Sequence, residues 1–571
     1  MQACNNKTIG DWLSDIKNKS LCLPRFQRKQ VWSKDNVIQF LKTLVSSYET
    51  PVGMFLVLTT NPSNPAFPIR TIDGSDARSA YCDSLLLDGQ QRLSALWKAL
   101  HDEDKKFRYY FRFNEQFEIE GVDWGDKQTR KEKNRNQNPK NQCKERLFPA
   151  KLLNPLSNES GLDEWLQGTE SEETESIKNL IRETRKIFGF DETEGKVIPY
   201  FSLPADTDKK TAIEIYKTIN TNSVTLSQYY LAVADMEGEV DESLYNVLEE
   251  LVESEPLIEK LENKDIGEMF LKISCLLQNL MPTNRNYKKL SFEKIKNSKQ
   301  SIFEGVKWTV KELKNLKIGD HRQLPSIVPL RVLPALHQSM PPSGQRIADA
   351  SQMVKKYLWY AFLTDRYDKQ ANDRLKKDYD DLNSRFKNER KRINKDGIRI
   401  FKEHKSPSKT DIINTGWPQA KNRLARGALL VCCQGGARAL ASDEPLTIDN
   451  CEQRDRHHIF PRSRLPCKGE GSGDRVLNCL FIPEEDNNEY GDDLPGDCIK
   501  KISKSLDVPS SRAKVEKRLE THLISKELTR DLGKVTQDAI DRGRISLQDA
   551  YNKFIVARAK DVEIKIKELL K

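Results

Sequence analysis

The amino-acid sequence predicts an α+β protein built from several domains. A chain of 571 residues is too long for one hydrophobic core, because chains longer than roughly 250–300 residues divide into domains. Its first hundred residues alternate strand-like apolar runs with helical segments, whereas the pattern from 237 to 363 is mainly helical. We therefore predict domains at residues 1–236 and 376–571, joined by a helical coupling region at residues 237–375.

The N-terminal domain is predicted to be a compact α/β unit. Continuous apolar runs at residues 52–59 and 84–87 are typical of buried strands. Residues 36–48 and 91–100 instead place apolar side chains at the period of about 3.6 residues that marks a helix. Strands and helices thus alternate along this part of the chain.

The composition indicates a protein with a large wetted surface and a mild preference for polyanions. Charged residues make up 31% of the chain, and the net charge is +9. The chain has no run of about 18 apolar residues and no apolar leader at its start, which predicts no membrane span and a cytoplasmic location. Eleven cysteines without a CxxC pair indicate reduced thiols and disfavour a zinc site built from cysteines.

The first candidate site lies in LLLDGQQRL, residues 85–93, where a strand ends at Asp88 and Gly89 and a helix begins near Gln91. A glycine at such a turn lets backbone amides approach a ligand, and a helix N-terminus favours an anion. Arg92 has the planar donor geometry that binds phosphate. The same residues also fit an ordinary capped turn, in which Asp88 accepts amide hydrogen bonds and Arg92 pairs with a surface acid.

The second candidate site lies in RDRHHIFPRSRL, residues 454–465, where two of the seven histidines are adjacent. On a strand, neighbouring side chains point to opposite faces, so His457 and His458 are expected to have different partners. A neutral imidazole is suited to taking a proton from water near neutral pH. The alternative is that both histidines simply lie on the surface beside a turn.

Two asparagines follow the histidines at positions that return amide side chains towards them. Residues 476–482 are predicted to form a strand that carries Asn478, and Asn487 follows near the start of a helix. An imidazole beside a metal ligand, together with such amides, is the set of groups that a single-metal nuclease needs, because the metal offsets charge on the phosphate under attack.

A basic run at residues 374–405 precedes the histidines at partly helical spacing. We predict that Arg390, Lys391 and Arg392 contact DNA phosphates. A solvated helical face is the alternative explanation for the same charges.

Three ordered motifs carry a family resemblance for the N-terminal domain. DGQQRL, LPRFQRKQVW (residues 23–32) and IYKTINTNSVTLS (residues 215–227) together resemble the N-terminal domain of the GmrSD-type modification-dependent (type IV) restriction endonucleases. The resemblance implies a ParB/sulfiredoxin-like fold that binds and hydrolyses a nucleoside triphosphate. The residues that it implies for nucleotide binding are Asp88, Gly89, Gln90, Gln91, Arg92, Gln27 and Arg28.

The region around the two histidines is similar to the His-Asn-His (HNH) ββα-metal nuclease domain of the same family, in which His-Ile-x-Pro is followed by two asparagines. By that resemblance His457 is a metal ligand and His458 is the general base. Asn478 orients the base or its loop, and Asn487 is the second residue on the metal side. The implied metal is Mg²⁺ or Mn²⁺.

The two resemblances together imply a defence endonuclease that cleaves or nicks phage DNA carrying modified bases or a modified backbone, coupled to nucleoside triphosphate binding and hydrolysis. A nucleotide-dependent DNA-binding regulator or toxin-like switch, which does not cut, is the alternative from another class. An HNH protein that cuts RNA is a third reading. Action as a homodimer is compatible with each of them.

Overall fold

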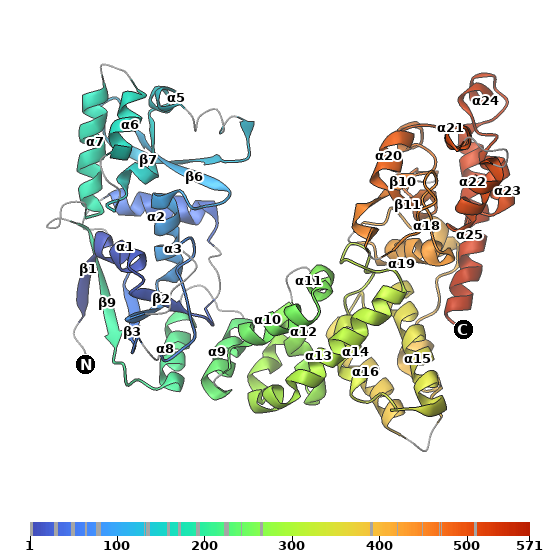
Figure 1. Ribbon diagram of the computed structural model, residues 1–571, viewed down its shortest axis with the longest axis horizontal. Helices are drawn as coiled ribbons and strands as arrows, with labels where there is room; N and C mark the ends of the chain where they lie inside the picture. Colours follow the sequence, from blue (N-terminus) through green and yellow to red (C-terminus); the bar gives the residue numbers. More distant parts are fainter. Residues whose placement is uncertain are drawn as a thin grey trace. The chain divides into compact units, whose positions relative to one another are not determined.

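The computed structural model forms two compact units, Met1–Tyr245 and Asn246–Lys571 (Figure 1). It describes the chain except residues 1–3, 28–31, 47–51, 63–64, 76–81, 131, 133–137, 157–159, 170–172, 190–194, 222–227, 241, 263–265, 389–391, 395, 420, 448, 467–468, 470 and 507–510. The first unit is mixed α/β and the second is mainly helical, as the sequence predicts.

The predicted domain boundaries at 236 and 375 both fall inside helices. The first lies in α9 (Gln228–Val240), and the second lies in α16 (Ala371–Lys387). The coupling region and the histidine region share one unit, because α15 (Gly344–Leu363) packs against α19 (Arg423–Cys432). The approach is close, since a Cβ on Gly427 would lie 2.7 Å from the Phe362 carbonyl oxygen. Periodicity along the chain does not reveal this packing.

A six-stranded mixed sheet forms the centre of the first unit, in the order β1-β9-β3-β5-β2-β4. Its strands are β1 (Asn5–Thr8), β9 (Val197–Leu203), β3 (Phe55–Thr59), β5 (Ser84–Asp88), β2 (Leu21–Pro24) and β4 (Ile69–Arg70). Strand β3 pairs antiparallel with β5 and parallel with β9. The strands predicted at 52–59 and 84–87 are therefore confirmed as β3 and β5, although β3 begins three residues later.

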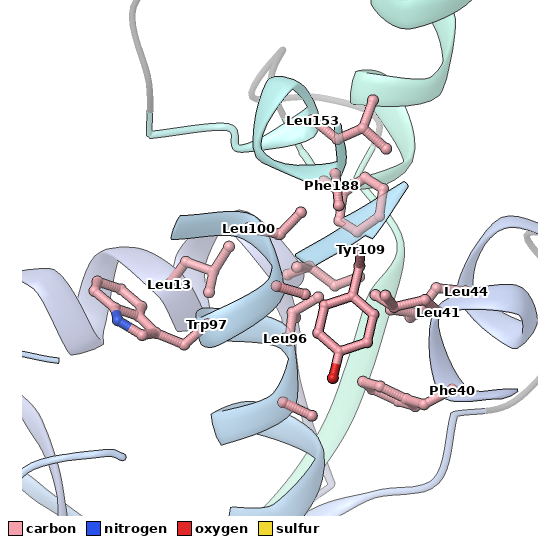
Figure 2. Close-up of a cluster of buried hydrophobic side chains, with 14 of the residues drawn as sticks. Leu13, Phe40, Leu41, Leu44, Leu96, Trp97, Leu100, Tyr109, Leu153 and Phe188 are labelled. Atoms are coloured by element: carbon pink, nitrogen blue, oxygen red, sulfur yellow. The ribbon is translucent and has the colours of Figure 1, made fainter. Parts of the chain in front are cut away.

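Helices pack on this sheet around an apolar core (Figure 2). The helices predicted at 36–48 and 91–100 are confirmed as α2 (Lys34–Ser46) and α3 (Gln90–His101). Their buried leucines meet those of α1 (Ile9–Lys17) and the ring of Tyr109 in Figure 2. The remaining elements of the unit are β6 (Phe107–Phe113), β7 (Ile119–Asp126), α5 (Pro139–Lys144), β8 (Leu147–Pro149), α6 (Ser160–Gln167), α7 (Thr174–Ile187) and α8 (Lys209–Thr221).

The second unit is mainly helical, which confirms the helical pattern of the middle of the chain. Its helices begin with α10 at the junction of the two units. They are α10 (Leu244–Ser254), α11 (Leu257–Glu262), α12 (Ile266–Leu277), α13 (Phe292–Asn315), α14 (Pro329–His337), α15, α16, α17 (Arg399–Glu403), α18 (Lys409–Asn414), α19, α20 (Glu484–Tyr490), α21 (Pro495–Ser505), α22 (Ser511–Glu520), α23 (Lys526–Leu532), α24 (Gln537–Asp541) and α25 (Leu547–Leu569).

A two-stranded antiparallel hairpin carries the histidines. Strand β10 (Arg454–His458) pairs with β11 (Cys479–Pro483), and α20 follows β11 directly, so two strands and a helix succeed one another (Figure 1). The strand predicted at 476–482 is corrected here, because Val476–Asn478 forms a 3₁₀ turn. Asn478 therefore precedes the strand, where its side chain can turn back into the connecting loop.

A buried arginine on α25 holds this hairpin to the rest of the unit. Arg558 is fully buried and donates to the carbonyl oxygens of Leu477 (2.7 Å), Cys479 (3.1 Å) and His522 (2.9 Å). Charged donors form stronger hydrogen bonds than neutral ones. The last long helix thus fixes both residues that flank Asn478.

The described residues can be compared with what the composition predicts for membrane spans and for cysteines. No helix within them is both long enough and apolar enough to cross a membrane. Their cysteines all carry free thiols, which agrees with the reduced state predicted from the sequence.

Replacing Arg558 by Leu is expected to destabilise the second unit by about 3 kcal/mol or more, because buried carbonyl groups would lose their donors at about 1–3 kcal/mol each. Urea unfolding together with hydrogen exchange of residues 476–482 measures the effect. Lys553→Leu, on an exposed position of the same helix, is the matched control and should change stability little. Equal stability of the two variants would contradict the role of Arg558.

His522 gives this unit a defined pH dependence. Burial lowers the pKa of His522 from 6.5 to about 4, and its Nε2–H donates to the Arg438 carbonyl oxygen at 2.8 Å. The unfolded chain therefore binds this proton more readily than the folded chain does. The stability contributed by neutral His522 is complete above pH 6.5 and is lost as the pH falls towards 4, at up to about 1.4 kcal/mol per pH unit.

His522→Gln retains a side-chain donor and removes the titration. Unfolding free energies of the parent and this variant should converge as the pH falls from 7 to 4.5. A difference that stays constant over this range would assign the pH dependence to other groups.

Candidate functional site

The two histidines at the end of β10 have different partners, as the alternation of side chains along a strand requires. The Nδ1 atom of His457 lies 2.9 Å from Oδ1 of Asn487 on α20. The Nε2 atom of His458 lies 3.1 Å from Oδ1 of Asp474. The structure therefore brings His457 and Asn487 together on one side of the strand and places His458 in a separate polar group.

On the His457 side of the strand, an imidazole nitrogen and an amide oxygen lie close together. Asn487 Nδ2 donates to Asp455 Oδ2 at 3.4 Å, which turns the amide oxygen towards His457. Burial lowers the pKa of His457 below its usual range, so its ring is neutral near pH 7. The amide oxygen can only accept, so the neutral ring carries its proton on Nδ1 and donates it to Asn487.

The pair would offer one imidazole nitrogen and one amide oxygen to a divalent cation. The 2.9 Å between Nδ1 and Oδ1 is a hydrogen-bond distance, so both atoms would be open to a cation only with the ring proton on Nε2. Within the described ranges, no three His, Cys, Asp or Glu side chains form a metal-binding group.

The His458 ring is held on two sides by residues that sequence reasoning missed. The indole of Trp417 stacks on the imidazole with ring centroids 3.7 Å apart and an interplanar angle of 7°. Asp474 binds Nε2 and also pairs with Arg462 Nε at 3.1 Å. Burial lowers the pKa of His458, while Asp474 opposes the shift. The position of Asp474, four residues before Asn478, is a sequence signal that could have identified it. No pattern in the sequence indicates a role for Trp417.

Asn478 closes the loop, and the hydrogen bonds described for its side chain do not go to His458. Its side chain is fully buried; Oδ1 accepts from the Phe460 amide at 2.8 Å, and Nδ2 donates to the carbonyl oxygens of Phe460 and Gly473, both at 2.9 Å. Of the two roles expected for Asn478, orienting the base or its loop, these contacts correspond to the loop.

The N-terminal candidate site lies where β5 passes into α3. Gly89 is the N-cap residue with φ of +102°, and a Cβ there would lie 2.1 Å from Phe55 Cδ1. Only glycine fits this turn without strain. Gln91 occupies the first turn of α3, whose backbone amides are the groups that bind anions at helix N-termini. Arg28, predicted for the same site, lies outside the described residues.

The side chain of Arg92 is engaged within the fold. Its guanidinium donates to the carbonyl oxygens of Val52 and Met54, both at 2.8 Å, and to Asp88 Oδ2 at 3.1 Å. It also lies over the Phe55 ring. These contacts correspond to the structural alternative, a pair with a nearby acid, and they pin the start of β3 to the end of β5.

Gln27 and Gln90 have partners other than those of Arg92. Gln27 is buried, and its Nε2 donates to the carbonyl oxygens of Leu86 (2.8 Å) and Leu87 (2.9 Å) on β5. Gln90 Nε2 lies 3.5 Å from Asp73 Oδ2. Arg70 donates to the Gln27 carbonyl oxygen and to Asp73, so Gln27 and Gln90 belong to one polar group, and the contacts of Arg92 belong to another.

Three cations of the basic tract at 374–405 form ion pairs with nearby acids. The ion pairs are Lys376–Asp380, Lys377–Asp373 and Arg399–Asp381. Arg392 is exposed, whereas Arg390 and Lys391 lie outside the described residues. The paired cations correspond to the solvated-face alternative, and a DNA contact by Arg392 stays a prediction.

The fold and site define a chain in which a mixed α/β unit is followed by a helical unit carrying a strand–strand–helix histidine site. Comparison with known proteins adds a family relationship to the first of these. Residues 9–236 match the family model for the GmrSD restriction endonuclease, N-terminal domain. The match covers less than half of the chain, lies wholly within the first unit, and supports a relation to the GmrSD-type restriction endonucleases.

A relative from Methanocaldococcus jannaschii, described as the uncharacterized protein MJ0686, is similar along its whole length. It is 22% identical, and the alignment covers 99% of each chain. The similarity therefore extends through both units and through the histidine region.

The contacts of Arg92 predict a structural effect of its removal. Arg92→Ala should destabilise the β3–β5 junction by at least about 2 kcal/mol, because charge-assisted hydrogen bonds contribute about 1.5–3 kcal/mol each. Hydrogen exchange of residues 52–58 should become faster, with Arg92→Lys intermediate because lysine keeps the charge and loses the planar geometry. Unchanged exchange combined with lost nucleotide binding would instead assign the guanidinium to phosphate.

Proposed function

We propose that this protein is a metal-dependent DNA endonuclease of a restriction-type defence system, with nucleotide binding in its first unit and cleavage in its second. The observation that carries the proposal is that the two adjacent imidazoles at the end of β10 have different partners. One imidazole converges with an amide oxygen of the following helix, and the next imidazole is held apart by a carboxylate and an indole. The relation of residues 9–236 to a restriction endonuclease supports DNA as the substrate.

In this mechanism the two sides of the strand have separate tasks. His457 and Asn487 would hold a divalent cation, Mg²⁺ or Mn²⁺, which supplies positive charge against the phosphate oxygens. His458 takes a proton from the attacking water through Nδ1, because Nε2 already donates to Asp474. Asn478 keeps the loop between the strands closed, so the base stays at a fixed position.

The first unit is proposed to bind and hydrolyse a nucleoside triphosphate. Its support is the family match together with the Gly89 turn, which leads a buried strand into the N-terminus of α3. We propose that backbone amides at the start of α3 bind the phosphates, with Gln27 and Gln90 lining the site. The guanidinium of Arg92 then acts by holding the turn, given its contacts with Val52 and Met54.

Phage DNA with modified bases or a modified backbone is the proposed substrate. The support is the resemblance of the motifs to modification-dependent enzymes and the net charge of +9, which favours a polyanion. The decisive assay incubates the full chain with modified phage DNAs, unmodified plasmid and RNA. Each is tested with Mg²⁺ or Mn²⁺, in the presence and absence of nucleoside triphosphates.

His458→Ala is expected to lower the cleavage rate by about a hundredfold to ten-thousandfold, the usual cost of removing a general base. DNA binding and nucleotide hydrolysis should stay near the parent values. His457→Ala should instead weaken metal affinity, so that excess Mn²⁺ restores part of its activity but none to the His458 variant. A fully active His458→Ala protein would refute the assignment, and a parent that never nicks DNA would favour the regulator.

A further inference from the structure

We propose that Asp474 and Trp417 are positioning residues for His458, holding its ring in one tautomer and one plane. The proposal rests on the proposed role of His458 as the general base. It goes beyond that role because neither residue belongs to the histidine and asparagine pattern. Both act through His458 and are expected to contact neither the substrate nor the metal.

The carboxylate of Asp474 selects the tautomer. Its Oδ1 lies 3.1 Å from His458 Nε2, and its Oδ2 accepts from Arg462 Nε at 3.1 Å. An ionised carboxylate can only accept, so Nε2 of a neutral ring must carry the proton. The lone pair is then on Nδ1, for which the described part of the chain provides no hydrogen-bond partner. Asp474 thereby leaves Nδ1 ready to accept a proton from water.

Trp417 fixes the plane of the same ring. Its indole covers one face of the imidazole in a nearly parallel stack. The His458 side chain is 23% exposed, and as the last residue of β10 it has no following strand residue to restrict it. Stacking on one face and a hydrogen bond at one edge together remove rotation of the ring. A base held in its reactive orientation avoids the entropy cost of finding it.

One backbone bridge brings both Trp417 and Asp474 next to His458. Gly416 and Arg475 form an isolated antiparallel bridge, and the Val476 amide donates to the Thr415 carbonyl oxygen at 3.3 Å. Trp417 directly follows Gly416, and Asp474 directly precedes Arg475. Two segments that are far apart in the sequence therefore meet around His458 through a single bridge.

The sharpest test is Asp474→Asn, because Arg462 makes its outcome predictable. Arg462 can only donate, so the amide oxygen of the new asparagine is expected to face Arg462 and its NH₂ group to face His458 Nε2. That arrangement places the ring proton on Nδ1 and removes the lone pair needed for proton transfer. The rate of single-turnover cleavage at saturating DNA should fall about a hundredfold or more, with DNA affinity within about twofold of the parent.

Two further variants separate tautomer control from a general structural effect. Asp474→Glu keeps a carboxylate and should restore most of the rate. Adding Arg462→Leu to Asp474→Asn frees the amide to turn its oxygen to His458, and this double variant should recover at least about tenfold over Asp474→Asn alone. Trp417→Phe should stay within about threefold of the parent, whereas Trp417→Ala should lose about tenfold in rate with unchanged DNA affinity.

The tautomer is also measurable without any cleavage. The chain has seven histidines, so ¹⁵N-histidine spectra of the full chain can be assigned by comparison with His458→Ala. The parent should show His458 protonated on Nε2, and Asp474→Asn should show the proton on Nδ1.

The tautomer measurement tests the positioning role of Asp474 separately from DNA cleavage. Loss of the Nε2–H tautomer in Asp474→Asn supports the positioning role even if the parent cuts no DNA. An unchanged tautomer in Asp474→Asn overturns the positioning role even if His458 is essential for cleavage. If the parent does cut DNA, equal rates of Asp474→Asn with and without Arg462→Leu would also overturn it.

Discussion

The hydrogen bonds of the buried guanidinium of Arg558 are the interaction on which the histidine site depends. They join α25 to the carbonyl groups on either side of Asn478. Asn478 in turn binds Phe460 and Gly473, and so closes the loop that leaves β10 and returns to β11. The position of His458 is thus fixed by a residue a hundred positions further along the chain. A charged group is suited to this task because one guanidinium can serve several carbonyl groups at once.

The hairpin allows two adjacent imidazoles to have separate chemistry. His457 is directed to Asn487 on α20, and His458 is directed to Asp474 and Trp417. Burial lowers the pKa of both rings, and a neutral ring is required of a metal ligand as well as of a base. The same desolvation therefore serves both proposed roles, while the partners of each ring decide which role it takes.

In the first unit, a motif that suggests ligand binding also maintains the fold. Gly89 is required by the close approach of Phe55, and Arg92 supports the start of β3. The similarity of residues 9–236 to the GmrSD N-terminal domain is therefore compatible with structural as well as nucleotide-binding constraints on DGQQR. Variants of this motif need a stability measurement beside any activity measurement, since loss of either gives the same phenotype.

The sequence by itself determined the elements whose signal is local. Apolar runs predicted β3 and β5, helical spacing predicted α2 and α3, and alternation along a strand predicted different partners for His457 and His458. Tertiary structure alone decided that Arg92 turns into the fold, that Asn478 precedes its strand, and that Trp417 stacks on His458. It also joined the helical middle to the histidine region in one unit. These features depend on contacts between residues distant in the chain, and periodicity reports only how a segment divides its faces between core and solvent, not which segment it will meet.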